Sequence, residues 1–419
     1  MNTLFWERKF FTNSQGLDNC VIKQIPEDFV VEEFFEKNIL SECRFFIKNA
    51  KNEIKFLPSR GNYVIGELEK RKIETIVAIE KISKKIKVNV EDISFSGMKD
   101  KWAVTCQKIC IKDLLKKIKT PIYDENFIFS PKNRSNCSLK IGGLCGNKFT
   151  VTIRNIYQDE EYIKNIVKNF EQEAKIGLPN YYGRQRFGGP RSVSHIIGKF
   201  IIDDKIKEAI NIFLMQSSPV DSEKLRYARK QIEYNQNYKK ALSGFPNELF
   251  YEKIVIKHLI KKPGDYLGAF EKINANLRRL FVFSYQSYLF NKMLEKRIEL
   301  LGKKTFQKQE GDIMCDNNIF GMVPGYMSEF SSGIQGEIEK EVLNEHGISF
   351  SYFEQAKKYG VNCRGEKRPI CMNLCDFNLV SILPDEINIG KNKLVVSFNL
   401  KSGQYATVFL EELLKTSLF

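Results

Sequence analysis

The chain has 419 residues, of which 42% are hydrophobic, 12% aromatic and 28% charged, a globular composition that excludes a disordered chain. Lys and Arg number 66 against 51 Asp and Glu, so the formal net charge is +15, which favours polyanionic partners. No run of about 18 apolar residues predicts a membrane span, and the first residues predict no secretory signal.

Strand-like runs occupy both ends of the chain. They are rich in β-branched and aromatic residues, and several alternate between apolar and polar side chains. The clearest alternation places Phe149, Val151 and Ile153 on one face. In chain order, the predicted strands fall within residues 20–33, 61–68, 92–96, 103–111, 148–154 and 393–400. With helices between them, these runs predict a mixed sheet.

Helical periodicity predicts the remaining elements. Thr75 is expected to cap a helix whose isoleucines at 76, 79, 82 and 86 share one face. A second helix, with an apolar stripe from Tyr162 to Phe170, is expected to stop at Gly177. From about 195 to 305 the pattern is almost entirely helical, and its longest element covers 275–300. A short helix is predicted at the end of the chain. An α+β sheet interrupted by a largely helical insertion fits this order.

The ten cysteines favour packed thiols over a metal site. Cys106 and Cys110 have a spacing that zinc accepts, as do Cys371 and Cys375, but both pairs lie in apolar, strand-like stretches. The only histidines, at 195, 258 and 346, are far apart. We therefore expect the cysteines to be free thiols in the core, with no metal bound.

A large share of the positive charge lies in one segment. Residues 251–304 contain twelve Lys and Arg against five acids, a local surplus of +7, interleaved with Tyr266, Tyr285 and Tyr288. Basic side chains with aromatic rings are typical of RNA-binding surfaces, where unstacked bases pack on the rings. A general lysine-rich bias of the composition is the alternative.

Asp100 is the carboxylate that the sequence favours most as a catalytic group. Nucleotide-binding glycine loops and Ser or Cys nucleophile motifs are absent, so catalysis would use carboxylates, lysines and arginines. Asp100 lies between Lys99 and Lys101 in a glycine-led loop, and neighbouring cations favour the ionised form that acts as nucleophile or base. A solvated surface turn explains the same residues, and both interpretations stay open.

Two further segments could contact a nucleic acid. In residues 180–189, tyrosines and Phe187 could stack on bases while Arg184 and Arg186 bind phosphate, or the segment could be a domain hinge. Asn147 could read a base edge beside Phe149, although a turn asparagine and a core phenylalanine are equally ordinary.

Two long motifs and six short ones resemble the TruD family of pseudouridine synthases. The long ones are Gly97–Gln107 (GMKDKWAVTCQ) and Asn180–Gly188 (NYYGRQRFG). The short ones are Pro26–Glu32, Gly146–Phe149, Ser284–Asn291, Val323–Gly325, Lys367–Pro369 and Ser402–Ala406. They occur in the family's order along nearly the whole chain. Lys367 departs from the family, which often has Arg there, and would cost a bidentate contact if that side chain bound phosphate.

The resemblance implies a role for each matching residue. Asp100 matches the catalytic aspartate, and Asn147 and Phe149 match residues that hold the target base. Lys23 and Phe29 match positions near the active site. We expect Lys99, Lys101, Arg184 and Arg186 to contact the substrate as well. The implied organisation is a discontinuous pseudouridine synthase catalytic domain, residues 1–183 and 376–419, with a mainly helical TRUD insertion domain at 184–375.

The resemblance also implies the reaction. A tRNA pseudouridine synthase, with uridine 13 as the expected target, breaks the C1′–N1 bond of uridine and rejoins the base through C5, an isomerisation that needs neither cofactor nor metal. Asp100 could attack C1′, attack C6 or remove the ribose 2′ proton. The expected partner is tRNA, with no membrane, no obligatory protein partner and a cytoplasmic location. The alternative is a non-catalytic RNA-binding or RNA-chaperone protein of the same fold.

Overall fold

The computed structural model describes residues 9–17, 19–35, 39–47, 60–138, 144–416 and 418. Residues 1–8, part of the start that was expected to carry no secretory signal, lie outside this set. The chain divides into two compact units. The sheet unit comprises Thr12–Lys175 and Asn373–Leu418, and the helical unit comprises Ile176–Met372 with the chain start up to Phe11. Among the described residues, no helix has the length and apolar character to cross a bilayer.

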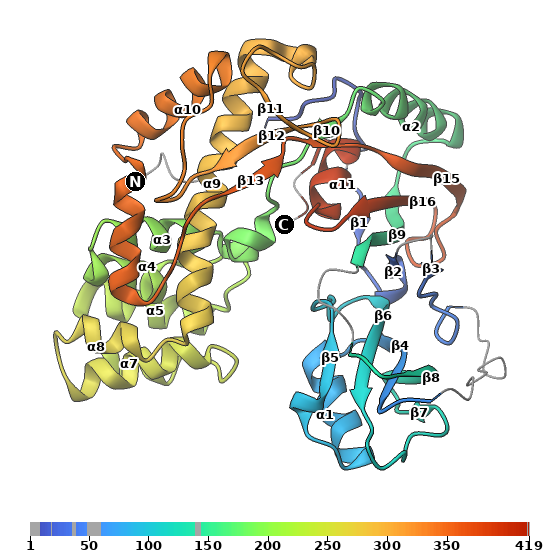
Figure 1. The fold of residues 1–419 in the computed structure, drawn as a ribbon, viewed down its shortest axis with the longest axis horizontal. Helices are drawn as coiled ribbons and strands as arrows, with labels where there is room; N and C mark the ends of the chain where they lie inside the picture. The colour runs from blue at the N-terminus through green and yellow to red at the C-terminus, as the bar shows by residue number, and fades with distance from the viewer. Residues whose placement is uncertain are drawn as a thin grey trace. The chain divides into compact units, whose positions relative to one another are not determined.

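The sheet unit is built on a mixed sheet of eleven strands in its described part (Figure 1). Its main path runs β15-β16-β9-β2-β6-β4-β8-β7, and β2 and β6 form the parallel pair at its centre. The strands are β1 (Val21–Ile22), β2 (Phe29–Phe35), β3 (Ile39–Leu40), β4 (Tyr63–Arg71), β5 (Ile93–Phe95), β6 (Val104–Lys112), β7 (Ile122–Tyr123), β8 (Phe127–Ser135), β9 (Leu144–Ile156), β15 (Cys375–Pro384) and β16 (Asn392–Lys401). The predicted α+β class is confirmed.

Three helices accompany this sheet: α1 (Thr75–Ile86), α2 (Glu160–Ala174) and α11 (Ala406–Leu414). Ile79 and Ile82 of α1 pack into an apolar cluster with Leu68 of β4. The expected cap of α1 is wrong. Glu74 occupies the N-cap position without a side-chain cap, and Thr75 is the first helical residue. Thr75 is fully buried, and its hydroxyl accepts the Lys99 N–H of the loop that carries Asp100. Ile76 is also 37% exposed and so lies off the buried face.

The helical unit centres on the long helix α9, along which α3 packs (Figure 1). The predicted helix over 275–300 is therefore confirmed. The helices are α3 (Ser194–Ile202), α4 (Ile206–Met215), α5 (Glu223–Asn235), α6 (Tyr238–Leu242), α7 (Phe250–Lys261), α8 (Tyr266–Glu271), α9 (Ala275–Leu301) and α10 (Gly333–Glu345). Two small sheets join them: β11 (Ile313–Cys315), β12 (Asn318–Val323) and β13 (Glu366–Pro369), and the pair β10 (Leu178–Pro179) and β14 (Cys371–Met372).

The cysteines do not all lie in the core. All ten are free thiols, as expected, but only four are buried: Cys43, Cys106, Cys110 and Cys363. Three are exposed, at 137, 315 and 375. The prediction of core cysteines is therefore wrong for these three, because Cys315 and Cys375 lie at the ends of strands and Cys137 follows one, where the chain leaves the sheet.

Candidate active site

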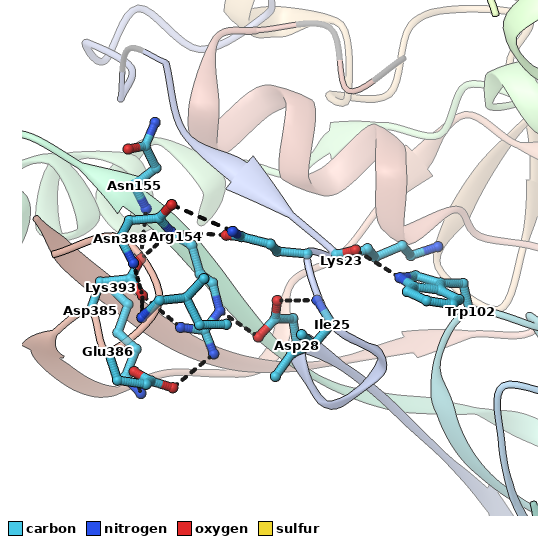
Figure 2. A network of polar contacts seen from close by, with 12 residues as sticks. Lys23, Ile25, Asp28, Trp102, Arg154, Asn155, Asp385, Glu386, Asn388 and Lys393 are labelled. Atoms are coloured by element: carbon cyan, nitrogen blue, oxygen red, sulfur yellow. Dashed lines mark hydrogen bonds and ion pairs between the residues drawn. The ribbon is translucent and has the colours of Figure 1, made fainter.

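Asp100 lies in the loop between β5 and β6, and its side chain is 40% exposed. The Lys23 ammonium forms an ion pair with Oδ2, and the backbone N–H of Trp102 donates to Oδ1 at 3.0 Å. The indole of Trp102 donates in turn to the carbonyl oxygen of Lys23 at 2.9 Å (Figure 2). The carboxylate is thus oriented through both oxygens, and Lys23 and Trp102 hold each other in place.

The sequence neighbours of Asp100 do not supply its counterion. Lys99 points to Glu33 instead, at 2.8 Å, and Lys101 lies 3.6 Å from Glu74 on the surface. The flanking lysines therefore make their ion pairs with other carboxylates. Successive side chains in this loop diverge, and the cation beside Asp100 comes from Lys23, 77 positions earlier.

Lys99 connects the loop to β2 and β9. Its ammonium donates to Asn147 Oδ1 at 2.7 Å and pairs with Glu33, whose side chain is fully buried. Glu33 and Asn147 are register partners in the antiparallel β2–β9 pair, which brings both side chains to one face of the sheet. Because an ammonium only donates, the amide oxygen of Asn147 faces Lys99 and the amide nitrogen faces away.

Phe29 and Phe149 form an apolar wall on the same face. Their ring centroids lie 5.9 Å apart in an edge-on arrangement, and Phe149 also stacks on Phe398 of β16 at 5.4 Å. The Lys23 ammonium lies 4.1 Å from the centroid of Phe29, so the wall adjoins the ion pair with Asp100. Of the residues selected from the sequence, Lys23 contacts Asp100 directly, Phe29 contacts Lys23, and Phe149 contacts Phe29. Asn147 is connected to Asp100 through Lys99, its neighbour in the chain.

A buried ionic cluster anchors the segment that carries Lys23 (Figure 2). Arg154 of β9 is 3% exposed and donates to Asp28 and Asp385, each at 2.7 Å, and to Glu386 at 3.0 Å. Hydrogen bonds from Arg154 and from Lys393 lower the pKa of Glu386 to about 2.

Asp385 extends this cluster toward Lys23. Burial opposes its ionisation, but hydrogen bonds from the Asn388 side chain and from backbone N–H groups hold the pKa of Asp385 well below its usual range. Asn388 also forms a paired amide contact with Gln24, with nitrogen-to-oxygen distances of 2.8 and 3.4 Å. Because Lys23 itself has a positive φ of 57°, these contacts help to hold an uncommon backbone conformation.

Several residues that support this site were not predicted from the sequence. The loop bearing Asp100 is supported by Thr75, whose hydroxyl accepts the Lys99 N–H at 3.1 Å, and by Gln107, which donates to Gly97 O at 3.0 Å. It is also supported by Lys70, a fully buried lysine of β4. A signal for Lys70 existed, because it continues the buried alternation of Val64, Gly66 and Leu68. A lysine at a buried position of a strand indicates that its charge has a polar partner inside the protein.

In the helical unit, α9 holds the Asn180–Gly188 segment in place. Asn291 exchanges two hydrogen bonds with the backbone of Tyr182, and Ser287 accepts from Arg186 Nε at 3.0 Å. Tyr181, Tyr182 and Phe187 are at most 5% exposed. The hypothesis that these rings stack on RNA bases is therefore wrong, because they are core residues: Tyr182 packs on Phe290 of α9, and Phe187 packs on His195 of α3.

The basic segment 251–304 needs a similar correction. Tyr285 and Tyr288 are fully buried, so they are core residues of α9 and offer no surface to a base. Arg297 is fully buried too, and its guanidinium pairs with Asp312 at 2.7 Å. Lys257, Lys261 and the other exposed cations of the segment still give it a basic surface, but Tyr285 and Tyr288 are not part of that surface.

Arg184 and Arg186 both lie in the short helical turn Arg184–Phe187, half-buried. Arg186 lines a cavity of about 300 Å³ within the helical unit, together with Phe283, Gln286, Val323 and residues 362–366. Among the described residues, no cluster of three or more His, Cys, Asp or Glu side chains has the geometry to hold a metal ion.

Comparison with known proteins identifies the family. The family model for tRNA pseudouridine synthase D (TruD) matches residues 7–320 and 316–413. A relative from Methanocaldococcus jannaschii, named tRNA pseudouridine synthase D 1, is 34% identical over 94% of this chain and 95% of its own. A relative from Methanococcoides burtonii, named tRNA pseudouridine synthase D, is 32% identical over 85% of this chain and 88% of its own.

A solved structure agrees with the sequence comparisons. The crystal structure titled as a tRNA pseudouridine synthase D (TruD) from Methanosarcina mazei superposes with a TM-score of 0.77 at 30% identity, and covers 98% of this chain and 97% of that one. The helical insertion and the interrupted sheet are thus shared with a TruD protein. The chain belongs to the TruD family of tRNA pseudouridine synthases.

Proposed function

We propose that this protein converts uridine to pseudouridine in tRNA, at position 13, with Asp100 as the residue that acts on the substrate. The observation that carries the proposal is the partly exposed Asp100 carboxylate, oriented by Lys23 and by the Trp102 N–H beside an aromatic wall. The relatives' names supply the substrate class, and the uridine position follows from the family resemblance.

The reaction needs a carboxylate that is held in place next to the sugar and base. The C1′–N1 bond breaks, C1′ joins C5, the C5 proton leaves to solvent and N1 gains a proton, so the product is an isomer. Asp100 can attack C1′, attack C6 or remove the 2′ proton, and each route uses an ionised carboxylate. The Lys23 ammonium pairs with Oδ2, and the Trp102 N–H donates to Oδ1. Together these two contacts fix the orientation of the carboxylate.

Asn147 is suited to hold the uracil. Lys99 occupies the amide oxygen, so the amide nitrogen is the group left to donate to a uracil carbonyl. Phe29 and Phe149 form the apolar packing beside it; at 4% and 8% exposed they are core rings that back the site and offer little surface to a base. The target base must leave its stack to reach these groups.

The helical unit contributes positive charge for RNA. We propose that its exposed lysines contact the phosphate backbone, and that Arg186 and Arg364 bind a nucleotide at the cavity they line with Phe283. We propose, in addition, that the sheet unit is the catalytic domain and that the helical unit is the insertion domain.

The decisive experiment measures tritium release from tRNA that carries 5-tritiated uridine. Asp100→Asn is expected to lose release entirely while its affinity for tRNA stays within about threefold. Asp92→Asn is a matched control, because Asp92 lies in the same unit just before β5 and contacts Lys112 instead of the site. This control should match the unchanged protein.

Two outcomes would contradict the proposal. Undiminished turnover by Asp100→Asn would remove the aspartate from the chemistry. Binding of tRNA without any tritium release by the unchanged protein would favour a non-catalytic RNA-binding protein. Position 13 is tested separately. Sequencing of the product tRNA should locate pseudouridine there, and tRNA with cytidine at that position should release no tritium.

A further inference from the structure

Lys70 is a buried lysine whose ammonium, among the described residues, hydrogen-bonds to backbone carbonyls only. It lies at the end of β4, an inner strand between β6 and β8, and its side chain is fully buried. Buried ammonium groups ordinarily pair with carboxylates. Within the described residues no carboxylate lies in ion-pair contact with Lys70. Instead its ammonium donates to Asp100 O at 2.6 Å, to Ile73 O at 2.9 Å and to Lys99 O at 3.4 Å.

These three acceptors join the catalytic loop to the end of β4. Lys99 and Asp100 belong to the loop before β6, and Ile73 belongs to the turn between β4 and α1. The three donors of an ammonium group match the three carbonyl oxygens. The supports through Thr75 and Gln107 are hydrogen bonds between neutral groups, whereas Lys70 adds charge-assisted ones to the backbone of the loop, beside the side-chain ion pairs of Lys99 with Glu33 and of Lys23 with Asp100.

We propose that Lys70 is a positioning residue for the reaction: its ammonium fixes the backbone at Asp100, so catalysis depends on its charge while tRNA affinity does not. This inference rests on the proposed role of Asp100. It extends that role to a residue that touches neither the carboxylate nor the substrate.

The environment of Lys70 makes its charge titratable near neutral pH. Burial lowers the pKa of Lys70 to about 8, and the Lys99 ammonium acts in the same direction. The negative charges of Asp100 and Glu74, and the nearby Cys43 thiol, oppose this shift. A neutral amine has two donors and one lone pair, so deprotonation leaves one of the three carbonyls facing a lone pair. The loop should therefore loosen as the pH rises above about 8.

The test uses two variants and a matched control under single-turnover conditions, from pH 6 to pH 10. Lys70→Met keeps the length of the side chain without donors, and its tritium-release rate at pH 7 should fall at least about tenfold with tRNA affinity within about twofold. Lys70→Arg keeps the charge, so the fall in rate seen above pH 8 in the unchanged protein should move to higher pH. Lys132→Met, on β8 of the same sheet, should match the unchanged protein.

The outcomes separate this inference from the proposed function. A Lys70→Met rate within about twofold of the unchanged protein, beside an inactive Asp100→Asn, overturns the role of Lys70 and leaves that of Asp100. An active Asp100→Asn overturns both. If neither Lys70 variant folds, the pH profile of the unchanged protein decides: a flat rate from pH 7 to pH 9.5, with tRNA affinity constant over that range, overturns the inference.

Discussion

Replacing Arg154 by methionine is expected to destabilise the sheet unit and to slow the reaction. The substitution removes the guanidinium but leaves Asp28 and Asp385, at most 2% exposed, as buried carboxylates without their cation. Breaking a buried ion pair from one side costs about 3–5 kcal/mol, because the remaining charge stays out of water. For a unit of roughly 210 residues, this corresponds to a fall in Tm of about 6–20 °C.

The cost should depend on pH in a defined direction. The folded-state pKa of Asp385 is depressed, so its contribution to stability is present above the unfolded pKa of about 4 and is lost as the pH falls toward the folded value. The difference in free energy of unfolding between the unchanged protein and Arg154→Met should therefore be largest near pH 7 and should shrink below about pH 4. Urea unfolding at 25 °C, followed by circular dichroism at several pH values, measures this difference.

Arg134→Met is the matched control for the effect on catalysis. Arg134 pairs with the buried Asp113 at 2.7 Å, and Asp113 also accepts backbone N–H groups, as Asp385 does. Strand β6 has nine residues, Val104–Lys112, and is therefore roughly 25–30 Å long. Asp113 follows its last residue and Asp100 lies before its first, so the two aspartates lie beyond opposite ends of the strand. Both variants should lose stability, but only Arg154→Met should lower kcat, by about tenfold at a temperature where both are folded.

Two results would refute this reasoning. A loss below about 1 kcal/mol at pH 7 would mean that Asp28 and Asp385 do not need the guanidinium. An equal kcat in the two folded variants would mean that the Arg154 cluster stabilises the unit without positioning Lys23.

Three further outcomes are expected. Asn388→Ala removes the paired amide contact with Gln24, worth about 1 kcal/mol, and should lower kcat about fivefold with little change in tRNA affinity, as single-turnover and binding assays can measure. The Tm of the sheet unit should fall as the pH drops from 4 toward 2, because the depressed pKa values of Asp385 and Glu386 make their ionised forms part of the folded state. Affinity for tRNA should fall by a factor of about 10³–10⁵ between 50 and 200 mM salt if 6–10 phosphates are contacted; a flat profile in a filter-binding assay would contradict the basic RNA surface.

Local sequence patterns predicted the elements well and the fate of individual side chains less well. The alternation at Phe149, Val151 and Ile153 identified β9 and its buried face, and the periodicity of residues 275–300 identified α9 within one residue. The same patterns could not distinguish a ring in the core from a ring that meets RNA. Tyr285 and Tyr182 are aromatic residues in basic surroundings, and both are buried because other elements cover them.

The candidate site was only partly predictable, because local patterns do not show which side chains meet. Resemblance to family motifs identified Asp100, which lies in the long motif Gly97–Gln107, and Asn147, which lies in the short motif Gly146–Phe149. The partners of Asp100 follow from strand pairing instead: parallel pairing of β2 with β6 and antiparallel pairing of β2 with β9 bring Lys23, Lys99 and Asn147 together. No spacing in the chain indicates that Lys23, and not a flanking lysine, meets the carboxylate.

By itself, the sequence determined the α+β class, the helical insertion and the family. These depend on periodicity and on motifs, which can be recognised without knowing which residues are in contact. The tertiary structure decided which charges meet. It paired Lys23 with Asp100, gathered two acids around the Arg154 guanidinium in the core, and placed the Lys70 ammonium against the backbone of the loop that carries Asp100. The physical reason is that electrostatic partners are set by distance in space and by exclusion of water, and both arise only when strands distant in sequence pair.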